Sequence, residues 1–142
     1  MENAVEQVNA FLMAQKLSIV CNEPLSFLPT LPVIPIHEFP QHCELTIAIG
    51  GDGTLLSASR ALAGTNMPIV GINVGRLGFL ADVTLNNLSQ QLGAILSGQY
   101  RDDNRFLLQA TIKGANNPTS IAMNDVVIHA HQNLHMLSLI HI

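Results

Sequence analysis

The first hundred residues alternate between two spacings of apolar side chains. Residues 2–16 repeat them at helical spacing, and residues 84–97 repeat leucine in the same way, so both stretches predict amphipathic helices. Short apolar runs lie between these helices and predict buried strands: 18–21, 45–49 and 68–72. Helices that alternate with short apolar strands are typical of parallel βαβ units, and the spacing therefore predicts an α/β domain over residues 1–100.

The pattern of apolar residues changes near residue 100. From Phe106 to Ile112, apolar residues alternate with polar ones, which predicts a half-buried strand. Residues 114–118 predict a turn, and residues 120–130 predict a second strand. Two strands joined by a tight turn differ from the βαβ pattern before them. Residues 101–136 therefore predict the first strands of a second, all-β domain.

The run Gly50-Gly51-Asp52-Gly53-Thr54 joins the predicted strand to a predicted helix that ends near residue 63. Glycine lets the backbone fold tightly and approach a ligand without a Cβ in the way. The helix N-terminus behind the run offers unpaired N–H groups and the positive end of the helix dipole, which suits phosphate. A carboxylate beside a phosphate repels it unless the carboxylate binds a metal or accepts a proton. Asp52 therefore indicates a phosphoryl-transfer site rather than a passive anion site.

A second glycine-rich run, residues 73–79, follows the next predicted strand. Ligands of open α/β sheets bind beyond the carboxyl ends of the strands, so both runs are expected beside one crevice. Arg76 in this run, and Arg60 in the helix after the first run, are candidate partners for phosphate charge, although a helical residue such as Arg60 is more often solvated or ion-paired. The alternatives are an ordinary strand–helix turn for the first run and, for the second, a loop with Phe79 in the core.

These two runs, followed by Asn124-Asp125, resemble the NAD kinase family in its bacterial form. That family pairs Gly-Gly-Asp-Gly with a downstream Asn-x-Gly-x-Leu-Gly-Phe and then Asn-Glu or Asn-Asp, and the resemblance runs from about residue 4 to Met136. It implies a Rossmann-like, phosphofructokinase-like parallel-sheet domain that lacks its first strand, followed by the start of a β-sandwich. The implied reaction transfers the γ-phosphoryl group of ATP to the 2′-hydroxyl of the adenosine ribose of NAD, giving NADP.

The resemblance also implies roles for individual residues. Asp52 would be the general base toward the ribose hydroxyl. Phe79 would pack on the adenine, Asn124 and Asp125 would bind polar edges of NAD, and His135 matches a position that contacts substrate in bacterial members. The residues implied to bind NAD or ATP are Gly50, Gly51, Asp52, Gly53, Thr54, Asn73, Gly75, Arg76, Gly78, Phe79, Asn124, Asp125 and His135.

The chain offers few side chains to neutralise phosphate. Its only lysines are Lys16 and Lys113, and it has no Walker A pattern. Mg²⁺ is therefore the expected metal, because it binds through few carboxylates plus phosphate oxygens, but no residue is assigned as its ligand. His129 and His131 lack a third ligand at a defined spacing and are expected to be solvated or hydrogen-bonded. ATP and inorganic polyphosphate both remain possible donors.

Composition and charge narrow the class of protein further. The chain is 48% hydrophobic and 11% charged, so it must bury much of its surface. A net charge of −4 without any basic cluster argues against a nucleic-acid or membrane-surface role. No apolar run is long enough to span a bilayer and no segment has a signal-peptide layout, which predicts a cytoplasmic protein with Cys21 and Cys43 as reduced thiols.

Two other functions compete with an NAD kinase. One is a lipid or sugar kinase with the same first turn, although a lipid kinase is expected to carry a Gly-Thr-Gly-Asn-like second run. The other is a non-catalytic nucleotide-binding fragment. The family resemblance implies a homo-oligomer whose second domain completes the active site, so this chain alone is expected to be inactive.

The last six residues do not continue the family pattern. Residues 137–142 equal the translation of CTGTCTCTTATACACATC, a transposase adapter used in preparing sequencing libraries. They are expected to be a non-native tail, and no function is assigned to them.

Overall fold

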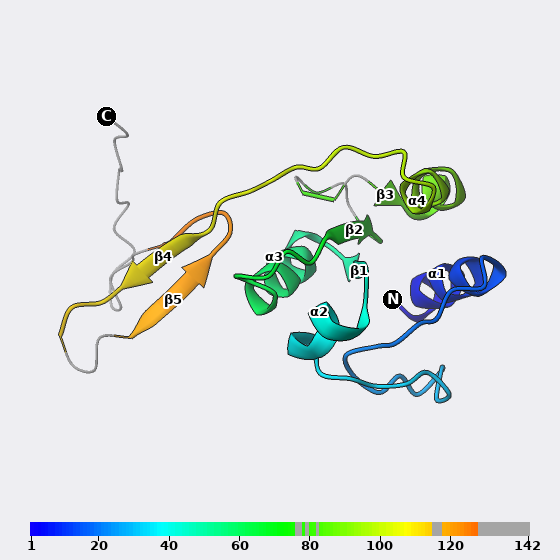
Figure 1. Cartoon of the computed structure of the whole chain (residues 1–142), viewed down its shortest axis with the longest axis horizontal. Coiled ribbons are helices and arrows are strands. Elements are labelled where there is room, and N and C mark those ends of the chain that lie inside the picture. Colours follow the sequence, from blue (N-terminus) through cyan, green and yellow to red (C-terminus); the bar gives the residue numbers. More distant parts are fainter. Residues whose placement is uncertain (76–77, 79, 82, 115–117, 128–142) are drawn as a thin grey trace. The chain divides into compact units, whose positions relative to one another are not determined.

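The computed structural model describes residues 1–75, 78, 80–81, 83–114 and 118–127. The chain divides into two compact units, Met1–Arg105 and Phe106–Ile142, each of which is described by itself (Figure 1).

A three-stranded parallel sheet forms the centre of the first unit. Its strands are β1 (Thr46–Gly50), β2 (Ile69–Asn73) and β3 (Val83–Thr84), in the spatial order β1-β2-β3. Side chains alternate between the two faces of β1, as in any strand. Both faces are covered, because Ile47 and Ile49 pack against one hydrophobic cluster and Ala48 belongs to another. The predicted strands 45–49 and 68–72 are confirmed with a shift of one residue, and so is the predicted parallel α/β class.

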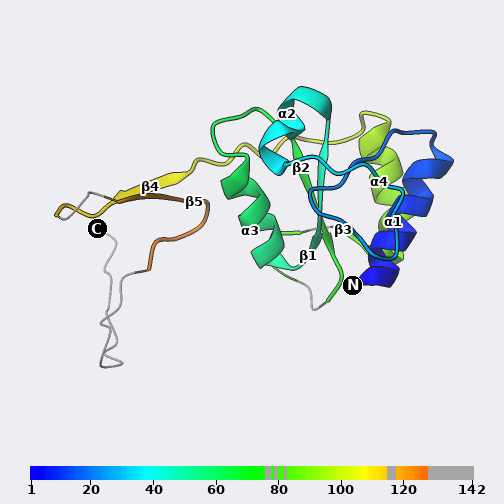
Figure 2. The ribbon, with the colours of Figure 1, turned by 90° about the horizontal axis from the view of Figure 1, so that it is seen from below.

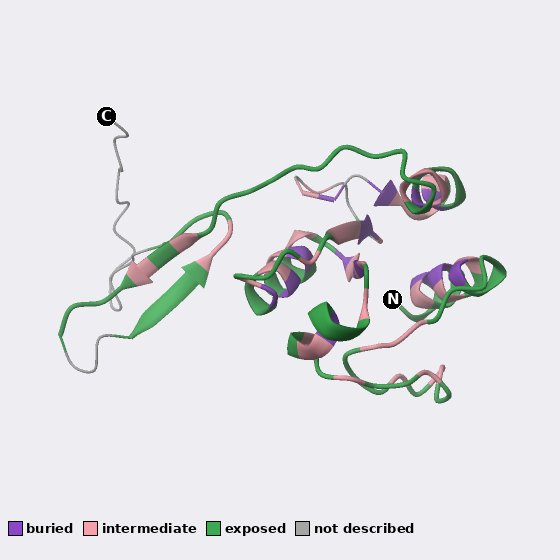
Figure 3. Ribbon diagram, viewed as in Figure 1, coloured by how far each residue is buried: buried purple, intermediate pink, exposed green. Residues whose placement is uncertain are grey.

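Helices cover both faces of this sheet (Figure 2). Helices α1 (Glu2–Ala14) and α4 (Leu88–Leu96) lie on one face, and α3 (Asp52–Ala61) lies on the other. The first face is closed by the buried side chains of Val8, Leu12, Ile72, Val83, Leu88 and Leu92. The second face is closed by the small cluster of Ala48, Leu55 and Ala58. The buried parts of α1, α3 and α4 lie on the sides of these helices that meet the sheet (Figure 3).

The helix predicted from Thr84 to about Ser97 forms in two parts. A 3₁₀ turn, η2 (Leu85–Asn87), precedes α4, and Thr84 and Asn87 form a capping box at its start. Gly98 ends the helix with φ +82°, and the N–H groups of Gly98 and Gln99 bond back to Ile95 and Ala94. This is a Schellman motif, which needs a residue that tolerates positive φ.

The predicted strand 18–21 is wrong. Only Cys21 makes a β-bridge, to Val33, with hydrogen bonds that join it to Pro32 and Ile34. The partner segment cannot extend a ladder because proline has no N–H group to donate. The connection that follows contains only two short elements, η1 (Ile36–Glu38) and α2 (Phe39–His42).

The second unit contains an antiparallel pair of strands. β4 (Leu108–Thr111) pairs with β5 (Thr119–Ala122) in a register that places Leu108 opposite Ala122. The predicted strand 120–130 is therefore wrong from residue 123 to 127, where Asn124 and Asp125 interrupt it, and residues 128–130 lie outside the described part. The β-sandwich itself stays a prediction.

Both cysteines are free thiols, as predicted from the sequence. Burial raises the pKa of the Cys43 thiol above its usual value, because desolvation disfavours the thiolate. In the part of the chain that the structure describes, no helix has the length and apolar character needed to cross a membrane.

Candidate active site

The first glycine turn is short and ends directly in a helix. Gly50 is the last residue of β1, Gly51 is the extended N-cap of α3, and Asp52 is the first helical residue. The first N–H groups of an α-helix have no partner within the helix, and the helix dipole is positive there. Gly51 and Gly53 are exposed at this end, whereas the N–H of the exposed Thr54 donates to the Gly51 carbonyl at 3.0 Å.

The second turn begins beside the first. Asn73 ends β2 directly opposite Gly50 in the parallel register, and the Val74 N–H donates to the Gly50 carbonyl at 3.2 Å. The buried side chain of Asn73 accepts a hydrogen bond from the Gly75 N–H at 2.9 Å, which bends the chain out of the strand. Both turns therefore start at the carboxyl edge of the sheet, where α/β proteins bind ligands.

The second turn then folds onto Asp52. The Leu80 N–H donates to Oδ1 of Asp52 at 3.1 Å, although the two residues are 28 positions apart in the chain. Gly78 lies so close that a Cβ on it would be 2.7 Å from Cγ of Asp52 and 2.9 Å from Oδ2. The half-buried carboxylate thus lies between the N-terminus of α3 and the second glycine turn. The structure brings together the two runs that the sequence placed beside one crevice.

Apart from Gly78, the glycines of the two turns and of β2 fall into two groups. A Cβ on Gly50 would lie 2.7 Å from Cβ of Thr54, and one on Gly71 would lie 2.9 Å from Cβ of Ala81, so packing excludes a side chain at both positions. The remaining three glycines have no described atom within 4 Å of such a Cβ, and none has a positive φ: Gly51, Gly53 and Gly75. Neither packing nor backbone conformation in the described chain requires glycine there. Close approach of a ligand would require it.

Five predicted site residues are not among the described residues of the first unit, which contains Asp52. Arg76, Phe79 and His135 lie outside the described residues. Asn124 and Asp125 belong to the second unit, where they are exposed and the Asn124 amide donates to the Asp125 carboxylate at 3.3 Å.

Arg60 lies away from the first glycine turn. It is exposed in the last turn of α3, eight residues after Asp52 and about 12 Å further along the helix axis at 1.5 Å per residue. The suggestion that Arg60 meets phosphate at the first turn is therefore not supported.

Sequence reasoning missed one contributor to the site, the backbone N–H of Leu80. No sequence signal identifies it, because every residue except proline carries the same group. The Thr54 side chain was assigned to ligand binding, and the structure adds a packing role, since this side chain occupies the space that a Cβ on Gly50 would need.

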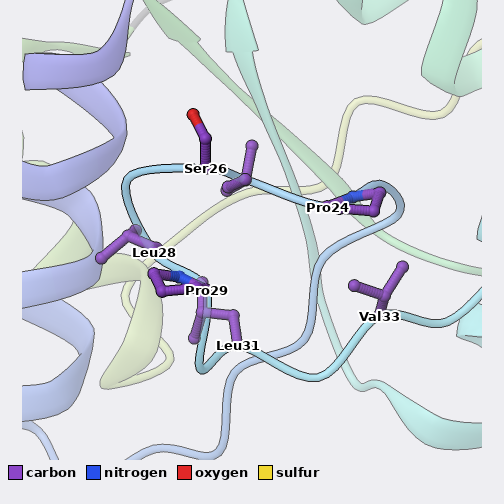
Figure 4. Close-up of a pocket in the computed structure, with 7 residues that line it drawn as sticks. Pro24, Ser26, Leu28, Pro29, Leu31 and Val33 are labelled. Carbon is purple, nitrogen blue, oxygen red and sulfur yellow. The ribbon is translucent and has the colours of Figure 1, made fainter.

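A separate apolar cavity of about 310 Å³ lies in the connection before β1 (Figure 4). None of its lining residues belongs to either glycine turn: Pro24, Leu25, Ser26, Leu28, Pro29, Leu31 and Val33. Its walls offer only one polar side chain, Ser26. This cavity is therefore no part of the candidate active site.

The fold and this site define a doubly wound α/β domain with a helix N-terminus and a glycine loop meeting at the carboxyl edge of its sheet. Residues 4–100 match the family model of the ATP-NAD kinase N-terminal domain. The chain belongs to the NAD kinase family, which confirms the resemblance read from its motifs.

Comparison with individual proteins agrees with this assignment. An NAD kinase from Teredinibacter turnerae is 42% identical over 139 residues, which are 94% of this chain and 47% of that protein. An NAD kinase from Nitrosococcus oceani is 39% identical over the same shares. The chain thus spans about half the length of these curated relatives. The crystal structure of yeast NADH kinase complexed with NADH has a TM-score of 0.63 and 21% identity, and it covers 86% of this chain and 42% of that chain.

Proposed function

We propose that this chain carries the phosphoryl-transfer half of an NAD kinase. In the full-length enzyme, the γ-phosphoryl group of ATP would pass to the 2′-hydroxyl of the adenosine ribose of NAD, giving NADP and ADP. The observation that carries the proposal is Asp52, a carboxylate held by the Leu80 N–H at the N-terminus of α3 in a chain of this family. A carboxylate beside a proposed phosphate site can contribute to the reaction by accepting a proton.

Asp52 is the proposed general base. The ribose 2′-oxygen forms the new bond to phosphorus, the bond from phosphorus to the bridging oxygen of ADP breaks, and the hydroxyl proton goes to the Asp52 carboxylate. An aspartate is a weak base, and its contribution comes from position and from proton transfer in a loose transition state. A positioned base contributes about 10²- to 10⁴-fold in rate.

The N-terminus of α3 is the proposed phosphate site. The positive end of the helix dipole suits phosphate oxygens, and the missing side chains of the exposed Gly51 and Gly53 leave room for them. Within the described residues, no three His, Cys, Asp or Glu side chains are grouped to hold a metal ion. This donor set fits Mg²⁺ that arrives bound to the nucleotide, because Mg²⁺ needs few protein ligands when phosphate oxygens and water complete its shell. The metal would neutralise phosphate charge, and the backbone of the chain would orient the phosphate.

The remaining predicted contacts belong to the same proposal. Arg76 would meet phosphate, Phe79 would pack on the adenine, and Asn124, Asp125 and His135 would bind NAD. The cytoplasmic location, the homo-oligomer and the choice between ATP and polyphosphate also stay predictions from the sequence.

Family membership argues against a lipid or sugar kinase, because the match includes the second turn as well as the first. Titration of the purified 142-residue chain with NAD, ATP and diacylglycerol separates the candidates. We expect binding of NAD or ATP and none of diacylglycerol. Binding of diacylglycerol alone would favour a lipid kinase over an NAD kinase.

The decisive experiment is Asp52→Asn in the full-length enzyme that carries this sequence. We expect kcat for NADP formation to fall by about 10²-fold or more, while the Kd values for NAD and ATP change little, since the amide keeps the shape and loses the basicity. NADP formation is measured with purified NAD, ATP and Mg²⁺. Retention of kcat within a factor of about three would exclude Asp52 as the base.

A further inference from the structure

Gly78, in the second turn, lies against the Asp52 carboxylate. The three atoms nearest to a Cβ built on Gly78 all belong to that carboxyl group: Oδ1, Cγ and Oδ2. Carbon and oxygen atoms pack at about 3.5 Å, so separations of 2.7 and 2.9 Å are not tolerated. Glycine at position 78 is therefore a condition for the observed position of the carboxylate.

This contact differs from the packing contacts of the other crowded glycines. A Cβ on Gly71 would meet Cβ and the backbone Cα of Ala81, and one on Gly50 would meet Cβ of Thr54, none of which can move without the backbone. The three described atoms nearest to a Cβ on Gly78 all belong to the end of a flexible side chain. The Asp52 side chain can rotate away without a shift of the backbone, but it then leaves the Leu80 N–H.

We propose that Gly78 and the Leu80 N–H are positioning elements for Asp52. The second glycine turn would hold the carboxylate in one orientation, with Oδ1 bonded to Leu80 and with no side chain at position 78 to displace it. This inference rests on the proposed function, because the orientation matters only if Asp52 acts as the base. It assigns the turn a task beyond ligand binding, which is to fix the base.

The first test uses the 142-residue chain and does not depend on activity. NMR of the Leu80 amide proton reports its hydrogen bond to Asp52, since a bond to a carboxylate moves the proton downfield. We expect Gly78→Ala and Asp52→Ala each to move this signal upfield, and the double variant to move it no further. Gly93→Ala is the matched control, because a Cβ there meets only Cζ of Phe11 at 3.8 Å. An unchanged signal in Gly78→Ala would overturn the inference.

The second test uses the kinetics of the full-length enzyme. We expect Gly78→Ala to lower kcat by about tenfold or more and to leave the KM values for NAD and ATP within about twofold, because the base is displaced while ligand contacts remain. In the Asp52→Asn background, the same change is expected to alter kcat by less than about twofold, since its effect passes through the carboxylate.

These outcomes separate the inference from the function on which it rests. If Asp52→Asn keeps full activity, the proposed base is wrong, whatever the NMR signal of Leu80 does. If Asp52→Asn is inactive but Gly78→Ala matches Gly93→Ala in kcat, the base stands and the positioning inference is overturned. A loss of kcat accompanied by a drop in melting temperature, and repeated in the Asp52→Asn background, would mean that Gly78 is merely structural.

Discussion

The two glycine turns look alike in sequence, but the structure uses their glycines differently. In the first turn, only Gly50 is crowded, while Gly51 and Gly53 face open space at the N-terminus of α3. In the second turn, Gly78 is crowded by the Asp52 carboxylate, and only Gly75 faces open space. Two glycines of the first turn thus leave room outside the fold, and one glycine of the second turn lets the chain approach itself.

The difference teaches that a glycine count does not measure a binding site. A glycine is needed where a Cβ would clash or where φ is positive, and elsewhere it costs conformational entropy. Gly71 belongs to the strand before the second turn and serves packing between α3 and the segment after the turn. Only the exposed glycines that nothing in the fold requires are direct candidates for a ligand.

The largest effect on stability is expected at Gly50. In Gly50→Ala, the new methyl group would meet Cβ of Thr54, which is fixed in the first turn of α3. The start of the helix must shift, and we expect a loss of about 3 kcal/mol in the free energy of unfolding, the upper range for overpacking. Urea denaturation of the 142-residue chain measures it. Thr54→Gly in the same chain should recover part of the loss, and a Gly50→Ala chain of unchanged stability would contradict the assignment of Gly50 to packing.

A smaller effect is expected at Gly71. In Gly71→Ala, the added methyl group would lie 2.9 Å from Cβ of Ala81 and 3.2 Å from Cδ2 of Leu55, and the leucine can adjust. We expect a loss of about 2 kcal/mol, which for a domain of about a hundred residues lowers the melting temperature by about 9 °C. Ala81→Gly removes the nearest clash, so the double variant should regain more than half of the loss. Equal melting temperatures for the single and double variants would show that the crowding is not the cause.

The elements of the first unit were largely predictable from the sequence. The short apolar runs predicted β1 and β2, and the leucine spacing over residues 84–97 predicted one helical stretch, because these signals are local. The strand expected at 18–21 failed because its only neighbouring segment contains proline. The strand expected at 120–130 was cut short after Ala122, where the polar pair that carries the family motif follows.

The site was predictable in its residue types and not in its contacts. Asp52 was identified because a carboxylate in a glycine-rich turn has distinctive chemistry, and Asn73 because it begins the second motif of the family. The contact from Gly78 and Leu80 to Asp52 was not, because it joins backbone groups and a side chain 26 and 28 positions apart. Whether a glycine faces a ligand or another part of the chain depends on such distant contacts, and no local pattern encodes them.

The smallest effect on stability is expected at Gly53, where a substitution should affect binding instead. This residue lies in the first turn of α3, and a Cβ on it would meet no described atom within 4 Å. Alanine is the better helix former, so Gly53→Ala should leave the free energy of unfolding unchanged or raise it by up to about 1 kcal/mol.

The same methyl group would stand where phosphate is proposed to approach the backbone. We expect Gly53→Ala to raise the KM for ATP in the full-length enzyme by about tenfold, the equivalent of about 1.4 kcal/mol of binding free energy. Gly93→Ala is the matched control, since it adds the same group to a helical glycine in α4 and should gain stability without any change in KM. If the two variants had the same KM, the open glycines of the first turn would have no role in binding ATP, and the contrast between the two turns would reduce to packing alone.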